Sequence, residues 1–304
     1  MNFASPTYGY PAWFLIGAAF VFGAALGSFL NVVVARVPTG ESIVWPGSHC
    51  CACGKGVRAS HNIPIASWFL LRGRCSECLA PFSIRYALVE LGYALVCAFA
   101  VARHGVSPDA AREVLLMAFL VVLTGTDLDH WLLPHEITWP GIAVGLFLAA
   151  AQGYERLLWH LLAGAVGYTL LVVIGYVGER AFQKEAVGGG DPWLLALIGA
   201  FLGVRALPAV LLLASLQGTV IGLVMIAARR RSEARREEDA PQTSAPAVLP
   251  QAPGPAGTSE DDGAGDDHWM PDPTAIPFGP FLALGAAEVL YFARLPLVLF
   301  PWPF

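Results

Sequence analysis

Residues 11–34 read PAWFLIGAAFVFGAALGSFLNVVV and carry no charged side chain. A membrane-spanning helix needs about 20 consecutive apolar residues, so this run predicts a first transmembrane helix over residues 12–34. No Lys or Arg precedes the run, and it is longer than the apolar part of a cleavable signal peptide. We therefore expect this helix to be retained, with the N-terminus outside.

Apolar runs of this kind recur along the whole chain. Hydrophobic residues make up 56% of the sequence, only 13% of residues are charged, and the mean hydropathy is +0.59. Soluble proteins carry about a quarter charged residues, so this composition predicts an all-α polytopic membrane protein with about eight transmembrane helices. The predicted spans are residues 12–34, 85–103, 113–130, 137–152, 158–178, 191–204, 207–228 and 279–300. The fourth and sixth of them are short.

Basic residues are distributed unevenly between the two predicted sides of the membrane. One side receives Arg36, Lys55, Arg58, Arg72, Arg74, Arg85, Arg180, Lys184, Arg229, Arg230, Arg231, Arg235 and Arg236. The other side receives Arg103, Arg112, Arg156, Arg205 and Arg294. Because the basic side of a membrane protein is normally cytoplasmic, we expect the first group to face the cytoplasm.

These observations divide the chain into five parts. Residues 1–34 hold the first helix, and residues 35–84 form a small cytoplasmic loop domain. Residues 85–231 form the membrane-embedded core, and residues 278–304 hold the last helix. Between them, residues 232–277 are rich in Pro, Ala, Gly and acidic residues. Such a composition cannot bury a hydrophobic core, so we expect a disordered cytoplasmic linker there.

The loop domain contains two CxxC pairs, Cys50 with Cys53 and Cys75 with Cys78. Each pair can present two thiolates from one turn, and two such turns can close a tetrahedral metal site. A closed set of four ligands predicts structural zinc, and a cytoplasmic location favours metal over the alternative, two disulfides. Three neighbours leave the ligand set open, because each is a candidate substitute: His49, Cys51 and His61.

Two acidic motifs stand at the ends of predicted helices. TGTDLDH closes the third span with Asp127 and Asp129, and GGGD opens the sixth span at Asp191. The third helix runs inward and the sixth outward, so Asp127 and Asp191 should meet near the cytoplasmic boundary. Carboxylates at a membrane edge are costly and are functional by default, so we predict a hydrolytic pair.

The local sequence suggests how each carboxylate is presented. Residues two apart on a helix face different directions, so only one of Asp127 and Asp129 can easily face Asp191. Gly188, Gly189 and Gly190 allow a turn and a close backbone approach. We expect Asp191 at the N-cap position of its helix and Pro192 at the first helical position. Two close carboxylates cannot both ionise easily, and which of the two holds the proton is left open.

The chain resembles the type IV prepilin peptidases, which are bifunctional leader peptidases and N-methyltransferases of the GxGD aspartic protease class. The resemblance rests on motifs in order along nearly the whole chain. They are Gly27 to Val33 with Arg36-Val37-Pro38, the double CxxC around Asn62-Ile63-Pro64 and Ser67-Trp68, Leu71 to Cys75, Arg85-Tyr86, Val89-Glu90-Leu91, Asp127 to Asp129, Leu133-Pro134, Gly188 to Asp191, and Pro277 to Phe281.

The resemblance implies a specific activity. Asp127 and Asp191 would be catalytic, with Asp129 and the three glycines supporting them. The enzyme would cleave the basic leader from type IV prepilins and pseudopilins at the cytoplasmic face of the bacterial inner membrane. It would then methylate the new N-terminal residue with S-adenosylmethionine. Weak candidates for the methyl-donor site are Asn31, Arg36 and Glu90. No nucleic acid is implied as a partner.

Two departures from the family pattern lie next to the acidic motifs. The family usually carries an acid directly after Leu-Pro, where this chain has His135-Glu136. It often has an aromatic residue and then a lysine after the second aspartate, where this chain has Pro192 and Trp193. Two other functions compete with the peptidase: a proton-coupled transporter that uses the same carboxylates as a relay, and a zinc-stapled scaffold without catalysis.

Overall fold

A computed structural model describes residues 9–183, 187–239 and 276–292, and within these ranges the chain is helical. The long helices are α1 (Ala12–Arg36), α3 (Arg85–His104), α4 (Pro108–His130), α5 (His135–Ala150), α6 (Tyr154–Phe182), α7 (Asp191–Leu202), α8 (Ala206–Asp239) and α9 (Gly279–Phe292). The loop between α1 and α3 carries a 3-10 turn (Ala59–His61) and the short helix α2 (Ala66–Leu70). Only isolated bridges pair extended backbone in the described residues. The all-α prediction is confirmed.

The number of membrane spans is not confirmed at eight. Among the described residues, four helices are long and apolar enough to cross a membrane: Ala12–Arg36, Arg85–His104, Tyr154–Ala181 and Val204–Ser232. At about 1.5 Å per residue, the 12 residues of α7 extend about 18 Å, which is shorter than the hydrocarbon core of about 30 Å. Residues 293–300 of the last predicted span lie outside the described residues.

The chain divides into two units, one of which is Thr219–Ile276. The other unit, the helical bundle with the cysteine loop, holds every site considered below. Helix α8 continues to Asp239, so residues 232–239 are helical although their composition predicts linker. Ala, Arg and Glu in this stretch favour helix. Residues 240–275, the rest of the predicted linker, lie outside the described residues.

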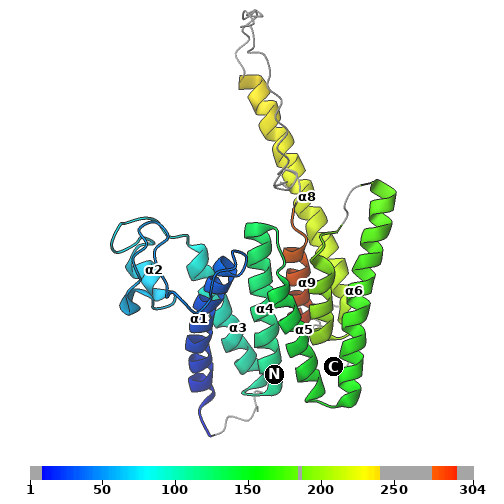
Figure 1. Ribbon diagram of the computed structural model, residues 1–304, viewed down its shortest axis with the longest axis horizontal. Coiled ribbons are helices and arrows are strands. Elements are labelled where there is room, and N and C mark those ends of the chain that lie inside the picture. The colour runs from blue at the N-terminus through cyan, green and yellow to red at the C-terminus, as the bar shows by residue number, and fades with distance from the viewer. Residues whose placement is uncertain (1–8, 184–186, 240–275, 293–304) are drawn as a thin grey trace, which may run out of the picture. The chain divides into compact units, whose positions relative to one another are not determined.

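Helices α1 and α3 pack side by side, and the loop that carries α2 lies at one end of the pair (Figure 1). The close approach depends on two glycines of α1 that are four residues apart. A Cβ on Gly23 would lie 2.8 Å from Cys97 Cβ, and one on Gly27 would lie 2.8 Å from Glu90 Cα. Small residues at this spacing let two membrane helices come into backbone contact.

Helix α7 is enclosed within the bundle, because it packs against α4, α5, α6 and α9. Almost all of its residues are buried, from Asp191 and Pro192 to Phe201. A Cβ on Gly199 would lie 2.6 Å from the carbonyl oxygen of Ala163, so α6 and α7 touch through backbone there. A short helix that is apolar all round is stable in this position because its neighbours cover every side.

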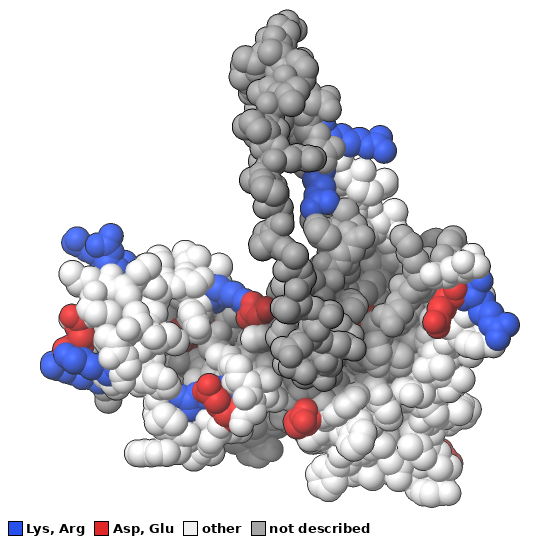
Figure 2. Space-filling view, turned by 45° about the horizontal axis from the view of Figure 1, so that its top comes forward, with Lys and Arg blue, Asp and Glu red and all other residues white. Residues whose placement is uncertain are grey.

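The outer surfaces of the bundle are apolar. Phe147 of α5 is 72% exposed, and Val173 and Tyr176 of α6 are each more than half exposed. Figure 2 shows a broad surface without charged side chains at the lower right, while charged groups lie over the cysteine loop at the left, across the middle and at the right edge. Exposed apolar faces of this extent fit a bundle surrounded by lipid.

Candidate active site

Asp127 lies in the last turn of α4 and is only 6% exposed. The helix ends three residues later, where Trp131 adopts a left-handed conformation and its N–H donates to the carbonyl of Asp127 at 3.0 Å. Thr126, its neighbour, is fully buried. The end of α4 therefore directs Asp127 into the bundle, although carboxylates are seldom buried without a partner.

Asp191 is the first residue of α7 and is 4% exposed. The predicted position is wrong by one residue, because Gly190 is the N-cap and Asp191 is already helical. The carboxylate still binds backbone ahead of the helix: the N–H of Gly188 donates to Asp191 Oδ2 at 3.2 Å. The backbone of the glycines forms the turn before α7. The helix therefore begins one residue earlier than it would with Asp191 as its side-chain cap.

The fold brings Asp127 and Asp191 to the same end of the bundle. Helix α4 contacts α7, and both carboxylates are buried at this end. Leu133, in the segment after α4, lies between the two sites. A Cβ on Gly190 would lie 2.6 Å from Leu133 Cβ, and one on Gly279 would lie 3.5 Å from Leu133 Cδ2. Two buried carboxylates in this arrangement can share one proton, as an acid–base pair requires.

Helix α9 supplies a third element to this site. A Cβ on Gly279, its first residue, would lie 2.4 Å from Asp127 Oδ2. Pro277 to Phe281 are among the motifs that carry the resemblance, but no role in the site is predicted for them from sequence. The PFGP sequence contained a usable signal, since a glycine before a proline at a helix start often marks a close backbone approach.

The three glycines before Asp191 differ in the room that they leave for a side chain. A Cβ on Gly190 would meet Leu133, and one on Gly188 would lie 3.2 Å from Asp191 Oδ2. A Cβ on Gly189 would meet nothing within 4 Å. Glycine is therefore required at Gly190, and a side chain at Gly188 would press on the Asp191 carboxylate.

Asp129 faces away from the pair. Its carboxylate forms an ion pair with Arg85 at the start of α3, and Arg85 Nη2 also donates to the carbonyl of Gly125 at 3.3 Å. Asp129 remains 36% exposed. One arginine thus holds the last turn of α4 at two points, which fixes the helix end that presents Asp127.

Aromatic side chains surround the start of α7. Trp193 lies 4.6 Å from Tyr168 and 5.7 Å from Trp139, measured between ring centroids. His135 stacks on Trp139 at 5.5 Å and also meets Trp193 edge-on. The two departures from the family pattern, at His135 and Trp193, therefore belong to one cluster. Trp139 is 56% exposed, so the cluster offers an apolar surface beside Asp191.

The cysteine loop brings four thiols together as predicted. The Sγ atoms of Cys50, Cys53, Cys75 and Cys78 all lie within 4.8 Å of one another, and those of Cys50 and Cys78 are 3.8 Å apart. A tetrahedral zinc ion with Zn–S bonds of about 2.3 Å holds its sulfurs about 3.8 Å apart. The four residues can therefore hold a metal ion. Cys51 is exposed and is not a member of the group.

The two CxxC turns have matching backbone structures. In the first, the N–H of Cys50 donates to the carbonyl of Lys55 and the N–H of Gly54 to that of Cys50; in the second, Cys75 and Leu79 repeat the pattern. Hydrogen bonds from the backbone of Cys53 and Ala52 lower the pKa of Cys50 to about 7, which favours the thiolate that a metal binds.

The three weak candidates for the methyl-donor site lie near the junction of α1, α3 and the loop. Asn31 donates to the carbonyl of Tyr86 at 3.1 Å, and Glu90 accepts from the N–H of Ile65 at 2.6 Å. Arg36 is buried and donates to three loop carbonyls, those of Ser42, Pro46 and Gly47. All three side chains therefore tie the loop or α1 to its neighbours. Arg36 also lines a cavity of about 360 Å³ between α1 and the loop, beside Ser28, Ser48 and Asn62.

Comparisons with known proteins cover both halves of the bundle. Residues 21–104 match the bacterial peptidase A24 N-terminal domain, and residues 114–223 match the type IV leader peptidase family. The first match contains the cysteine loop, and the second contains Asp127 and Asp191. Helix α9, which brings Gly279 to the pair, lies outside both matches.

Several similar proteins carry the name prepilin leader peptidase/N-methyltransferase. One from Myxococcus xanthus (strain DK1622) is 40% identical over 296 residues, covering 89% of this chain and 88% of the relative. One from Pseudomonas putida is 36% identical, covering 73% of this chain and 84% of the relative. One from Neisseria gonorrhoeae is 35% identical, with 72% and 85% covered. No solved structure matches the chain.

Proposed function

Because the chain belongs to the type IV leader peptidase family, we propose that it removes the leader from type IV prepilins and pseudopilins and then methylates the new N-terminus. The observation that carries the proposal is the pair of buried carboxylates, Asp127 and Asp191, at one end of the bundle. A relative with a printed peptidase and methyltransferase name aligns over 89% of this chain, which supports both activities.

The proposed cleavage divides two tasks between the carboxylates. The ionised one takes a proton from water, whose oxygen attacks the carbonyl carbon of the scissile peptide. The protonated one donates to the carbonyl oxygen, which gives a neutral tetrahedral diol. Breakdown of this diol releases the leader acid and the new amine, and the proton returns to the pair. The backbone N–H of Gly188 holds Asp191 in place throughout.

The aromatic cluster gives the site a wall on one side. We infer that Trp193 and Trp139 contact the apolar segment that follows the cleavage point, because they lie beside Asp191 and Trp139 is exposed. Basic residues concentrate on the side where α1 ends and α3 begins. In the proposal this side is the cytoplasmic face of the inner membrane. In the proposal, residues 1–34, 35–84, 85–231 and 278–304 are the first helix, the loop domain, the membrane-embedded core and the last helix, and the cytoplasmic linker begins after α8 at residue 240.

The test is an assay with the purified full-length chain in detergent or lipid nanodiscs. The substrate is a membrane-inserted prepilin with its leader, and mass spectrometry follows the loss of the leader mass. Labelled S-adenosylmethionine is then added to the cleaved product. We expect loss of the leader first and incorporation of one methyl group afterwards. An intact substrate after incubation with well-folded protein contradicts the peptidase, and neither the carboxylate geometry nor the comparisons favour the transporter.

For the methyl donor, we infer that S-adenosylmethionine enters the cavity between α1 and the cysteine loop. The cavity offers hydroxyl and amide groups from Ser28, Ser48 and Asn62, while the guanidinium of Arg36 shapes its wall by binding loop carbonyls. When bound, the donor supplies a methyl group to the amine that cleavage exposes. Asn31 acts there by joining α1 to α3, and Glu90 acts by holding the loop against α3.

Zinc in the cysteine loop is the first prediction. We expect the purified protein to hold one equivalent of zinc. Cys75→Ser with Cys78→Ser should abolish binding, because two of four thiolates are lost. Loss of the metal should also lower the melting temperature of the loop. The matched control is Cys51→Ser, which lies outside the cluster and should retain the full equivalent. Equal metal loss in this control would contradict the assigned ligand set.

The second prediction concerns Arg85 as a positioning residue. Arg85→Ala removes both contacts to the last turn of α4, the ion pair with Asp129 and the bond to Gly125. The partners are partly exposed, so we expect a stability loss of about 1 kcal/mol or less. Cleavage should fall roughly tenfold through a lower kcat, because the end of α4 that carries Asp127 loosens. Complete loss of cleavage in a folded variant would instead assign Arg85 to the chemistry.

A further inference from the structure

A polar pocket lies at the end of the bundle opposite Asp127 and Asp191. Its volume is about 200 Å³, and its charged lining consists of Arg103, His104, Asp109, Arg112, Glu113 and Arg156. We call it the distal pocket. Arg112 stands 15 positions before Asp127 on α4, which places it about 22 Å away along the helix axis. The proposed cleavage uses none of these residues.

Part of the charge in the distal pocket is neutralised within the protein. Glu113 is 2% exposed, and its Oε2 lies 3.1 Å from His104 Nε2 and 3.8 Å from a guanidinium nitrogen of Arg103. Arg103 also donates to the carbonyl of Leu290 in α9. These contacts join α3, α4 and α9 at this end of the bundle. They also give the positive charge of Arg103 a counterion within the protein.

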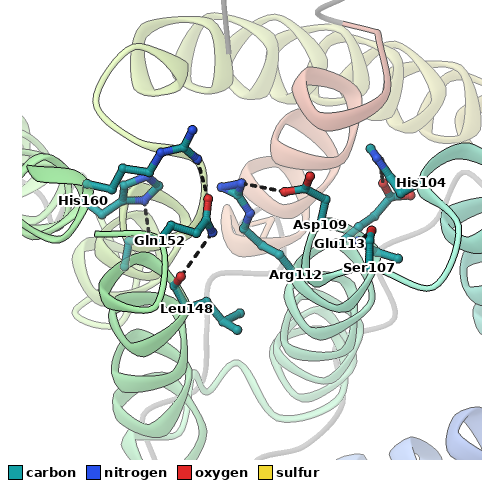
Figure 3. A network of polar contacts seen from close by, with 11 residues as sticks. His104, Ser107, Asp109, Arg112, Glu113, Leu148, Gln152 and His160 are labelled. Carbon is teal, nitrogen blue, oxygen red and sulfur yellow. Dashed lines mark hydrogen bonds and ion pairs between the residues drawn. The ribbon is translucent and has the colours of Figure 1, made fainter. Parts of the chain in front are cut away.

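The other two arginines are less well compensated. Arg112 meets Asp109 at 3.4 Å, but Asp109 is 60% exposed while Arg112 is only 25% exposed. Arg156 binds the neutral side chain of Gln152, which is itself held by the carbonyl of Leu148. Figure 3 shows Arg112 between Asp109 on one side and Gln152 on the other, with its guanidinium turned toward Gln152.

Arg112 and Arg156 carry like charges and line the same pocket. Two guanidinium groups that converge on one pocket from α4 and α6 repel unless an anion lies between them. One exposed carboxylate is a weak counterion for two arginines, because solvent screens it. Guanidinium groups bind phosphate oxygens through paired hydrogen bonds, and two of them can grip one tetrahedral anion.

We propose that the distal pocket binds a phosphate group through Arg112 and Arg156. The pocket lies at the C-terminal end of α3 and the N-terminal end of α6, both of which are candidate membrane spans. The ends of spanning helices lie at the depth of lipid headgroups. The phosphate of a phospholipid headgroup can therefore reach the pocket from the membrane, and a free phosphate compound can reach it from solution. The site is independent of the proposed peptidase activity.

The experiment uses the purified, delipidated full-length chain and native mass spectrometry. The probes are phosphatidylglycerol and a diacylglycerol with the same acyl chains, which lacks only the phosphate-bearing headgroup. We expect the protein to retain phosphatidylglycerol about tenfold better than diacylglycerol, in line with two charge-assisted contacts. Arg112→Gln with Arg156→Gln should remove this preference. Thermal stabilisation by inorganic phosphate, lost in the same variant, assigns the site to free phosphate compounds.

Two further variants serve as a matched control and as a milder alternative to the double variant. Arg205→Gln is the matched control, because Arg205 is exposed just before α8 and does not line the pocket. Arg156→Gln alone leaves no acidic partner unpaired, so it serves if the double variant does not fold. A phospholipid preference that survives in Arg156→Gln and in the double variant overturns the proposal. So does an equal loss of preference in Arg205→Gln, which would indicate general surface charge.

Discussion

Asp127→Asn and Asp191→Asn should each lower the rate of leader cleavage by about 10⁴-fold while the protein remains folded. Each substitution keeps the shape of the side chain and removes its ability to ionise. One carboxylate must activate water and the other must donate a proton, so neither can replace the other. The measurement is single-turnover cleavage of a membrane-inserted prepilin, with circular dichroism and size exclusion as checks on folding.

The double variant distinguishes a catalytic unit from two independent contributors. If the carboxylates act together, Asp127→Asn with Asp191→Asn should be no slower than either single variant, because the unit is already lost. Independent contributions would multiply instead. Glu155→Gln is the control, since Glu155 is exposed in the first turn of α6. Residual cleavage within tenfold of the native rate in either single variant would reject the pair.

The sequence predicts the helices and the meeting of the two aspartates for simple reasons. Long apolar runs mark helices such as α1 and α6, because lipid leaves no other partner for backbone groups. The alternation of inward and outward helices then places the end of α4 and the start of α7 at one face. Both inferences can be made without knowing which helices contact one another. The clustering of Cys50, Cys53, Cys75 and Cys78 also follows from local spacing, and the structure confirms it.

Features that depend on packing between distant segments could not be predicted in this way. Hydropathy treats α7 as a span, whereas it is a short helix enclosed by four others. The spacing of Asp127 and Asp129 does not show which of them faces Asp191, and the structure separates them because Asp127 is buried whereas Asp129 is partly exposed and pairs with Arg85. The convergence of Arg112 and Arg156 also requires the fold, since they stand on different helices. In each case the deciding contact joins residues far apart along the chain.

Gly279 is the strongest example, and it leads to the prediction with the second-largest effect. We expect Gly279→Ala to lower cleavage by about 10²-fold or more while the bundle stays folded. The added methyl would lie 2.4 Å from Asp127 Oδ2 and 3.5 Å from Leu133 Cδ2. The carboxylate is the end of a side chain and can rotate away, so the fold tolerates the change. The same rotation moves the Asp127 carboxylate away from the position in which it acts together with Asp191.

The matched control is Gly189→Ala, also a glycine-to-alanine change beside the pair, where the added methyl meets nothing within 4 Å. It should cleave at close to the native rate. The contrast between the two alanines separates displacement of a carboxylate from a general need for flexible backbone. Gly279→Ala should also resemble Asp127→Asn in leaving thermal stability nearly unchanged, because the space it needs is obtained by moving one side chain. Normal cleavage in Gly279→Ala would mean that Asp127 does not work from the position that the start of α9 defines.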